Sequence, residues 1–519
     1  MQYQIPSPVI ETLETLTKAG FSAHIVGGCV RDLLLGREPK DWDITTDATP
    51  DKILALFPDS FYENDFGTVG VKTVPFLSSG NPDRKHDIVE VTTYRTETGY
   101  SDNRRPDKVS FAATLEEDLA RRDFTMNAIA ARAITKNQEL ITNEAELEIT
   151  DPFGGHDDIR KKIIRAVGNA DERFGEDALR MIRAVRFFSE LLKPANKEQP
   201  EADRDQEKEN KDGGWKIEEK TLEAIKKHAG SIAHVSWERI RDEFSAIILS
   251  RNPTEGVELL NETGLLRHIL PELEEGIGVG QNLHHVYTVW EHNLRALHTC
   301  PSEKLEVRLA ALLHDVAKPR TKRGNGYRST FYNHDHVGAR MTRIILTRLR
   351  YPKNMVEKAV LLVDNHLFYY NVGEVTESSV RRLVRRVGLE NMADLMAVRI
   401  GDRLGSGVPK AKPYKLRHLE YMIDRVSKDP ISVKMLAIHG NDLLDGLGME
   451  PGPKIGAILD VLLSEVIENP EKNTKEHLLA RARKLSSEEI GALREKAKEM
   501  IDDRREQDDR NTKKKHRVE

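Results

Sequence analysis

The chain has 519 residues, too many for one hydrophobic core, and its length suggests about two to four domains. Lysine and arginine number 80 against 85 aspartate and glutamate, so the net charge is 80 − 85 = −5 and any polyanion site must be a local patch. No apolar run approaches the ~20 residues of a membrane span, and two cysteines exclude a disulfide framework and an all-cysteine zinc site.

The first 150 residues predict mixed α and β structure. The opening sequence MQYQIPSPVI lacks the basic and apolar regions of a secretory leader, so we expect a cytoplasmic protein. Amphipathic periodicity predicts a helix over residues 8–19, ended by Gly20. A second helix is predicted from Val30. Apolar or alternating β-branched residues predict strands over 22–26, 41–45, 68–74 and 87–94.

From residue 151 onward the sequence predicts almost only helices, because apolar residues recur at spacings of three and four, as in 178–188. Residues 195–214 contain almost no apolar side chain and therefore predict a disordered insert. The final segment, 502–519, interleaves acidic and basic side chains and predicts a solvated, frayed tail.

A glycine pair and an aspartate pair form the first candidate site. Gly27 and Gly28 separate a strand from a helix, which places bare backbone N–H groups where a phosphate can sit. Asp41 and Asp43 are two apart on a predicted strand and therefore project from one face. Such carboxylates repel each other unless a cation lies between them, and their oxygen ligands select Mg²⁺. A solvated strand end carrying these residues stays open as the alternative.

Three further segments extend the pattern. The predicted strand DIVEV supplies a third carboxylate, and we favour Glu90 over Asp87. Residues 121–128 have the sequence RRDFTMNA, and residues 175–187 have the sequence GEDALRMIRAVRF. Over roughly residues 20–275, these motifs together resemble the class II tRNA nucleotidyltransferase and poly(A) polymerase family, which is built on the polymerase-β-like nucleotidyltransferase fold.

The resemblance implies a role for each matching residue. Asp41 and Asp43 match the catalytic metal-binding pair, with Glu90 or Asp87 as a further ligand or a base. The matching nucleotide-binding residues are Gly28 and Arg31 for the triphosphate, Arg122, Asp123 and Asn127 near the ribose and phosphates, and Asp177, Arg180, Arg183 and Arg186 for the base and phosphates. The implied reaction is attack of an RNA 3′-hydroxyl on the α-phosphorus of ATP or CTP, with release of pyrophosphate.

The spacing of Asp177 and Arg180 gives a separate reason to expect base recognition. Three residues apart on a predicted helix, they should share a face. The carboxylate would accept from the exocyclic amine of cytosine or adenine, and the guanidinium would donate to a ring nitrogen or carbonyl. Uracil and guanine present a carbonyl where the carboxylate needs a donor, so we expect them to be rejected. An exposed ion pair on an amphipathic core helix is the alternative.

The second candidate site is a set of histidines and aspartates within residues 280–405. The sequence LLHDVAK ends an apolar run, where a buried His-Asp pair is costly unless something coordinates it, and such ligands suit a divalent transition metal or Mg²⁺. The region resembles the HD superfamily of metal-dependent phosphohydrolases, which implies as ligands His292, His314, Asp315 and Asp402, with His334 and His366 as additional ones. Three histidines are left over and predicted to be ordinary residues or neighbours of the ligands: His284, His285 and His336.

The predicted fold is α+β: a polymerase-β-like nucleotidyltransferase head with a small mixed sheet, then an all-α neck and body and an all-α HD domain. We expect a head over 1–150, a base-recognising neck over 151–275, an HD domain over 276–410 and an RNA-binding body with a frayed tail over 411–519. The predicted function is template-independent addition of CCA to tRNA 3′ ends with CTP, ATP and Mg²⁺, together with phosphohydrolysis by metal-activated water. The predicted partners are tRNA, ATP and CTP, with no membrane.

Four other functions stay open. A poly(A) polymerase, or an enzyme that adds only A or only C, shares the quoted motifs and differs in a mobile loop, which we place at residues 75–105. We favour CCA addition because the sequence has no long arginine-rich extension. An HD phosphohydrolase with a non-catalytic RNA-binding N-terminal region, a non-catalytic RNA-binding protein and a nucleotidyltransferase for small molecules or proteins are the others. RNA contact, or else a solvated helix face, is predicted at Arg381, Arg382, Arg385 and Arg386.

Overall fold

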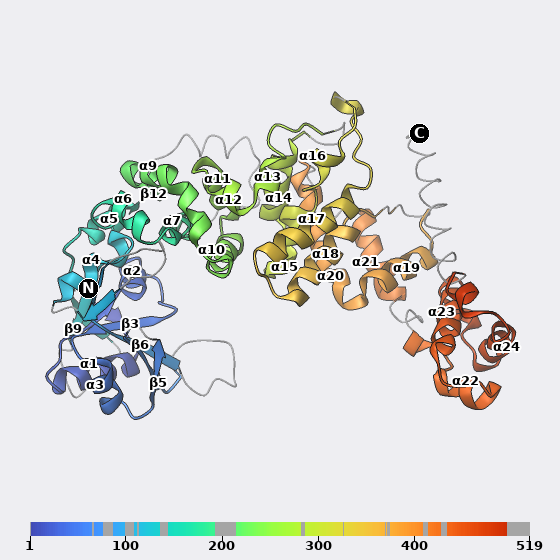
Figure 1. Ribbon diagram of the computed structural model, residues 1–519, viewed down its shortest axis with the longest axis horizontal. Helices are drawn as coiled ribbons and strands as arrows, with labels where there is room; N and C mark the ends of the chain where they lie inside the picture. The colour runs from blue at the N-terminus through green and yellow to red at the C-terminus, as the bar shows by residue number, and fades with distance from the viewer. Residues whose placement is uncertain are drawn as a thin grey trace. The chain divides into compact units, whose positions relative to one another are not determined.

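The computed structural model in Figure 1 describes residues 2–64, 67–75, 87–98, 108–111, 114–134, 144–192, 214–281, 286–324, 326–368, 370, 374–407, 414–426 and 433–495. These residues fall into two compact units, one within 1–274 and 348–351, the other within 275–347 and 352–519. The predicted insert (except Gly214), the frayed tail, His284 and His285 lie outside the described residues. Among the helices that are described, none combines the length and apolar character that a bilayer crossing requires.

The first unit contains an eight-stranded mixed sheet. β3 and β6 are parallel neighbours, and the other neighbouring pairs described in this sheet are antiparallel. In spatial order the strands are β1 (Gln2–Gln4), β10 (Glu144–Thr150), β9 (Ala130–Ile134), β2 (Ala23–Val26), β3 (Trp42–Thr46), β6 (Asp87–Thr93), β5 (Thr68–Thr73) and β4 (Ser60–Asn64). The predicted α+β head with a mixed sheet is confirmed. The bounds of the four predicted strands differ by at most one residue from those of β2, β3, β5 and β6.

Helices cover both faces of this sheet, as Figure 1 shows. α1 (Ser7–Lys18) and α3 (Pro50–Leu56) contact each other on one face, and α2 (Gly28–Leu34) and α5 (Gly155–Lys161) contact each other on the other. α1 matches the predicted first helix, which Gly20 follows with φ +89°. The remaining elements are α4 (Leu115–Ala120), the 3-10 turn η1 (Thr125–Asn127) and the hairpin β7 (Arg95–Thr98) and β8 (Lys108–Phe111).

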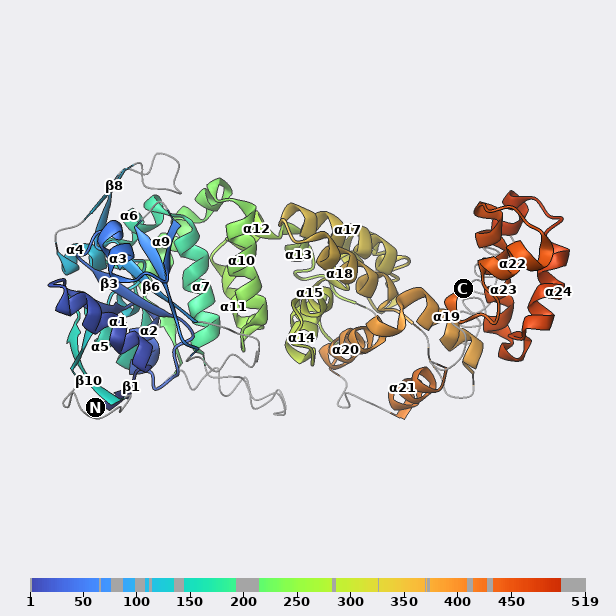
Figure 2. The ribbon, with the colours of Figure 1, turned by 90° about the horizontal axis from the view of Figure 1, so that it is seen from below.

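Helices follow the sheet within the same unit. α7 (Leu179–Leu191) packs against α10 (Trp237–Leu249) and α11 (Pro253–Glu262), which lie side by side in Figure 2. Buried residues such as Ile182 and Val185 of α7 form the apolar stripe that the periodicity predicts. The other elements are α6 (Ala170–Glu176), α9 (Glu219–His228), η2 (Ala229–His234), α12 (Leu266–Ile269), α13 (Pro271–Glu274) and the strand pair β11 (Ile163–Ile164) and β12 (Lys216–Ile217).

The elements described in the second unit are helices, and an isolated antiparallel bridge joins Arg323 to Thr330. α14 (Val289–Thr299) packs on α15 (Leu305–Leu313) and α20 (Leu389–Gly405), and α15 packs on α18 (Lys353–Asn365). The other helices are α16 (Lys318–Thr321), η3 (Gly326–Arg328), α17 (His334–Arg348), α19 (Glu377–Val387) and α21 (Tyr414–Val426). This packing of helices far apart in sequence positions the second candidate site.

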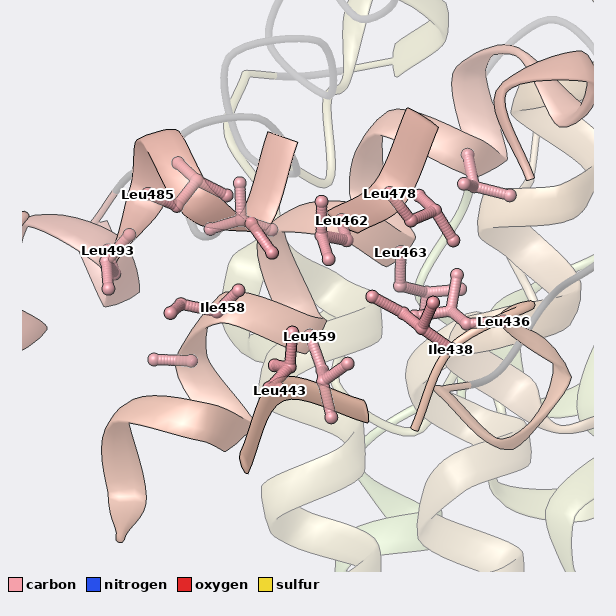
Figure 3. Close-up of a cluster of buried hydrophobic side chains, with 14 of the residues drawn as sticks. Leu436, Ile438, Leu443, Ile458, Leu459, Leu462, Leu463, Leu478, Leu485 and Leu493 are labelled. Atoms are coloured by element: carbon pink, nitrogen blue, oxygen red, sulfur yellow. The ribbon is translucent and has the colours of Figure 1, made fainter. Parts of the chain in front are cut away.

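The C-terminal helices enclose an apolar cluster of their own, drawn in Figure 3. Ile458 and Leu462 of α23 (Pro453–Glu468) face Leu443 of α22 (Gly440–Leu447) and Leu478 of α24 (Lys475–Leu485) within it. The short turns η4 (Val433–Met435) and η5 (Pro470–Lys472) adjoin this cluster. The predicted four-part division of the chain stays a prediction.

Three of the four arginines predicted to contact RNA or water are instead engaged within the protein, and the fourth, Arg386, is exposed. Arg381 is buried and donates to the Ile467 carbonyl, Arg382 pairs with Glu468, and Arg385 donates to Ser464. These three partners belong to α23, which packs on α19. Arg381, Arg382 and Arg385 therefore hold α19 against α23, because a carbonyl, a carboxylate and a hydroxyl 79 to 86 residues later in the chain accept from them.

Candidate functional site

Asp41 and Asp43 lie at the start of β3, beside the turn that joins β2 to α2. Trp42 and Ile44 are buried, so the alternation of side chains along the strand places the two aspartates on one face. Asp41 is exposed and Asp43 is half-buried. The Oδ2 atom of Asp43 is 3.8 Å from the point that a Cβ atom on Gly27 would occupy, so it points toward the glycine turn.

Glu90 is the third carboxylate beside this pair. β3 and β6 run parallel, and Asp43 lies opposite Glu90 in their register. Asp87, three residues earlier on β6, points to the opposite face and is fully buried. The register therefore supports the preference for Glu90 over Asp87 as the neighbour of the aspartates.

Glu63 of β4 is a fourth carboxylate, which the sequence pattern did not predict. Burial raises the pKa of Asp43, and Arg122 lowers it. The negative charges of Asp41 and Glu63 raise it as well. Burial also raises the pKa of Glu90 to about 7, with help from the other three carboxylates. Like charges held together in this way favour the binding of a cation, so the donor set fits a hard divalent metal.

The glycine turn is tightest at Gly27. Its φ is +80°, and a Cβ atom there would lie 2.8 Å from Nη1 of Arg122. Gly28 is the first residue of α2, and the nearest side-chain atom to a Cβ atom there would be Nη2 of Arg31 at 3.8 Å. Glycine is therefore favoured at residue 27 as well as at residue 28, because the positive φ of residue 27 is strained for other residues and a side chain there would also displace the Arg122 guanidinium.

Asp123 is the centre of the RRDFTMNA segment. Its carboxylate accepts from the Asn127 amide at 3.1 Å and pairs with Arg183 at 2.7 Å. Burial would raise the pKa of Asp123, but Arg183 and Asn127 hold it at about 2. Arg31 donates to Asn127 at 3.0 Å, so hydrogen bonds connect the helix after the glycine turn with α7.

Three guanidinium groups gather around the Phe187 ring of α7. The ring centroid lies 5.1 Å from Arg31, 5.5 Å from Arg183 and 4.5 Å from Arg186. Glu243 of α10 pairs with Arg186 at 2.7 Å and with Arg183 at 3.4 Å. These contacts concentrate positive charge and fix its position, as binding of a triphosphate requires. Sequence reasoning missed Phe187 and Glu243, although Phe187 lies inside a quoted motif.

Asp177 and Arg180 do not share a helix face, in contrast to the prediction. α6 ends at Glu176 and α7 begins at Leu179, so Asp177 lies in the break and accepts from the Leu179 backbone N–H at 3.0 Å. Its other oxygen pairs with Arg239 of α10 at 2.7 Å. Arg180 pairs with Glu176 at 2.6 Å. The prediction was wrong because the apolar periodicity gives no sign of this break.

The second unit brings all six predicted ligands of the histidine–aspartate site together. All six are buried. Their coordinating atoms form two groups of three, in each of which the atoms lie within 4.8 Å of one another: His292, His314 and Asp402, and Asp315, His334 and His366. His336 lies outside both groups and pairs with Asp364 at 2.6 Å. We call the six residues the metal cage.

Backbone contacts turn three imidazoles of the metal cage inward. The Nδ1 atom of each donates to a carbonyl three residues earlier: His314 to Ala311, His334 to Phe331 and His366 to Val363. The Nε2 atoms then face the other residues of the metal cage, and those of His334 and His366 lie 3.3 and 3.7 Å from Asp315. A ring fixed by its second nitrogen in this way is typical of metal-ligating histidine.

Asp315 and Asp402 supply the negative charge of the metal cage. Burial would raise their pKa values, but Lys318 beside Asp315 and Arg399 beside Asp402 hold both well below the usual range. Both cations contact their carboxylate at 2.5 Å. Burial would lower the pKa of His314, but Asp315 and Asp402 raise it to about 10. The metal cage thus attracts a positive charge, and its nitrogen and oxygen donors fit a divalent ion.

Three features together define a nucleotidyltransferase: the mixed sheet, the carboxylates of Asp41, Asp43 and Glu90 beside the glycine turn, and the arginines of α7. Family models match along the chain: residues 23–165 match "Poly A polymerase head domain", 214–277 match "Probable RNA and SrmB- binding site of polymerase A", and 340–482 match "tRNA nucleotidyltransferase domain 2 putative". The chain belongs to the tRNA nucleotidyltransferase family that contains the CCA-adding enzymes.

Individual relatives match almost end to end. The CCA-adding enzyme of Geobacillus thermodenitrificans is 31% identical over 473 residues, which cover 90% of this chain and 94% of the relative. The A-adding tRNA nucleotidyltransferase of Deinococcus radiodurans is 31% identical over 460 residues, which cover 85% and 90%. The crystal structure of the Bacillus stearothermophilus CCA-adding enzyme in complex with CTP is 28% identical, with a TM-score of 0.63 over 92% of this chain and 97% of that one.

Proposed function

We propose that this tRNA nucleotidyltransferase adds CCA to tRNA 3′ ends, with CTP and ATP as substrates and Mg²⁺ as its metal. The observation that carries the proposal is the row formed by Asp41, Asp43 and Glu90 beside the Gly27 turn. The relative with bound CTP, which has the same fold over 92% of this chain, supports CTP as a substrate.

In this proposal the carboxylates bind the metal and the arginines bind the phosphates of the nucleotide. Asp41 and Asp43 are the ligands that would hold the metal, and Glu90 is a further ligand or a base. When bound, the metal lowers the pKa of the attacking hydroxyl and neutralises the triphosphate. Arg122, beside the Gly27 turn, and Arg31, beside Phe187, supply positive charge for the phosphates.

The direct test gives the purified protein a tRNA that lacks its CCA end, with each labelled NTP separately and with CTP and ATP together. We expect CTP to extend this tRNA by two residues, and ATP to complete it only after CTP, as CCA addition requires. UTP and GTP should be incorporated poorly. Incorporation of ATP alone into many-residue tails would contradict CCA addition and indicate a poly(A) polymerase.

A-adding activity is the second candidate, favoured by the Deinococcus radiodurans relative. An A-adding enzyme would extend only a tRNA that already ends in CC. The same assay with tRNA ending before CCA and with tRNA ending in CC separates the two functions, because CTP incorporation into the first substrate excludes an enzyme that adds A alone.

Arg239 gives a prediction about base choice. Asp177 is the acceptor proposed for the exocyclic amine of cytosine and adenine, and Arg239 holds its carboxylate at 2.7 Å. Replacing Arg239 with alanine removes a charged hydrogen bond worth about 1.5–3 kcal/mol, so we expect the preference for CTP over UTP to fall about 10-fold or more. The ratio of kcat/KM values for the two nucleotides measures this.

The matched control for Arg239 lies two residues further along α10. Arg241 pairs with its neighbour Asp242 and with the carbonyl of Arg350, and Arg241→Ala should leave the ratio unchanged. An unaltered CTP preference in Arg239→Ala would mean that Asp177 does not depend on this contact to select the base.

We also propose that the metal cage is a hydrolytic site for phosphoesters. The six buried ligands, with imidazole rings fixed by backbone carbonyls, support a bound divalent ion. When bound, such an ion generates a hydroxide-like nucleophile near neutral pH. Hydrolysis of bis-p-nitrophenyl phosphate that requires added Mn²⁺ or another divalent metal, and that a chelator stops, tests the proposal. Absence of hydrolysis with every divalent metal tried would contradict it.

A further inference from the structure

α21 presents an aromatic face that the proposed function does not use. Leu416, Leu419, Met422, Ile423 and Val426 form its buried stripe. Tyr414, His418 and Tyr421 follow at a spacing of four and three residues and so share one side of the helix, away from that stripe. Tyr414 is 62% exposed and Tyr421 is 57% exposed, so two large rings of this face meet solvent.

The rings of this face form one cluster with Tyr370. The His418 centroid lies 5.8 Å from that of Tyr414 and 6.0 Å from those of Tyr421 and Tyr370. The Tyr370 hydroxyl lies 2.5 Å from Nδ1 of His418, which fixes the imidazole ring. Aromatic groups ordered in this way lose little entropy when a planar ligand stacks on them. We call these four residues the aromatic platform.

Positive charge accompanies the aromatic platform in the sequence. Between Leu404 and Leu419 the chain has no acidic residue, although the whole chain has a net charge of −5. Lys415 and Arg417 of that stretch are exposed residues of α21, and its other two cations, Lys410 and Lys412, lie outside the described residues. Acidic residues follow only in the second half of α21, where Arg425 pairs with Glu377 of α19 at 2.8 Å. The combination of planar rings and local positive charge suits a polyanion that carries planar groups.

A short segment joins the aromatic platform to the metal cage. His366 is a cage residue, and Tyr370 of the platform follows four residues later. Between them, the Phe368 ring lies 5.6 Å from the Arg399 guanidinium, which also holds Asp402 of the cage. Aromatic and cationic groups therefore continue from the phosphoester site toward α21.

We propose that the aromatic platform stacks the unpaired bases of a single-stranded RNA segment, while Lys415 and Arg417 of the same helix contact the RNA phosphates. Stacking on tyrosine and histidine is insensitive to base identity, since every base has a π face. The rings alone would also suit a protein interface, where tyrosine is common; the local excess of lysine and arginine is what favours RNA, because RNA is a polyanion. That this RNA is tRNA rests on the proposed function, whereas the proposal that this surface binds RNA does not.

The test compares RNA binding by the full chain and by two double variants. In Tyr414→Ala/Tyr421→Ala the exposed rings are lost; in Tyr414→Phe/Tyr421→Phe the stacking surfaces remain. Fluorescence anisotropy with a labelled octaadenylate should show about 10-fold or greater weakening for the alanine variant and nearly unchanged binding for the phenylalanine variant. Equal affinity of all three proteins would overturn the proposal that the aromatic platform binds RNA. A protein partner would then be the alternative occupant of this surface.

A second measurement separates this surface from RNA binding elsewhere in the protein. Octaadenylate carrying one 4-thiouridine should cross-link to the tryptic peptide from His418 to Arg425 in the wild type, and not in the alanine variant. Cross-links confined to other peptides would overturn the proposal. Nucleotide addition is measured in parallel: wild-type protein that cross-links through α21 but adds no nucleotide would contradict the proposed function alone.

Discussion

Replacing Asp43 with asparagine is expected to lower nucleotide incorporation into tRNA by about 10³-fold, because it removes a proposed metal ligand. Asparagine keeps the size of the side chain beside Gly27 and opposite Glu90, but it has no negative charge. Since Asp41 and Glu63 raise the pKa of Asp43 through repulsion, we expect the metal-free variant to unfold at no lower denaturant concentration than the wild type.

This pairing of lost activity with kept stability distinguishes a metal ligand from a structural carboxylate. Added Mg²⁺ should raise the midpoint of unfolding of the wild type more than that of Asp43→Asn, because ligand binding stabilises the folded state. Asp59→Asn is the matched control: this exposed carboxylate precedes β4 in the same domain, and its loss should change neither quantity. Incorporation by Asp43→Asn above a tenth of the wild-type rate would refute the assignment.

The elements that carry local chemistry were predictable from the sequence. Asp41 and Asp43 are two residues apart on a strand, so their common face follows from strand geometry alone. The choice of Glu90 over Asp87 likewise agrees with the register of β6 on β3. The six residues of the metal cage were predicted through motif resemblance, and helix packing brings together residues up to 110 positions apart, from His292 to Asp402.

Contacts between distant elements were not predictable. The charged partners of Asp177 and Arg183 on α10, Arg239 and Glu243, lie about 60 residues further along the chain and belong to an ordinary amphipathic pattern. The same limit applies to Arg382, whose partner Glu468 lies 86 residues later, so the arginines of α19 were interpreted as a surface feature. Periodicity reports which side of a helix is apolar, and it does not report what covers the polar side.

Replacing His314 with alanine is expected to remove phosphoester hydrolysis by the metal cage, with a loss of about 10²-fold or more, and to leave nucleotide incorporation within about 2-fold of the wild type. His314 forms one group of three with His292 and Asp402, and its Nε2 atom lies 2.9 Å from that of His292. Without it, the remaining imidazole and carboxylate of that group cannot enclose an ion. After loading with Mn²⁺ and dialysis, the His314→Ala variant should retain less metal than the wild type, as measured by mass spectrometry.

Two further variants make the His314 result specific. His314→Gln keeps most of the side-chain volume in this buried position, so loss of hydrolysis in both variants points to the missing nitrogen ligand and not to a cavity. His336→Ala removes a histidine of the same unit that pairs with Asp364 outside the metal cage, and it should retain both metal and hydrolysis. Full hydrolysis in His314→Ala would place the reaction elsewhere; parallel loss of nucleotide incorporation would indicate misfolding, since the proposed site of nucleotide addition lies in the other unit.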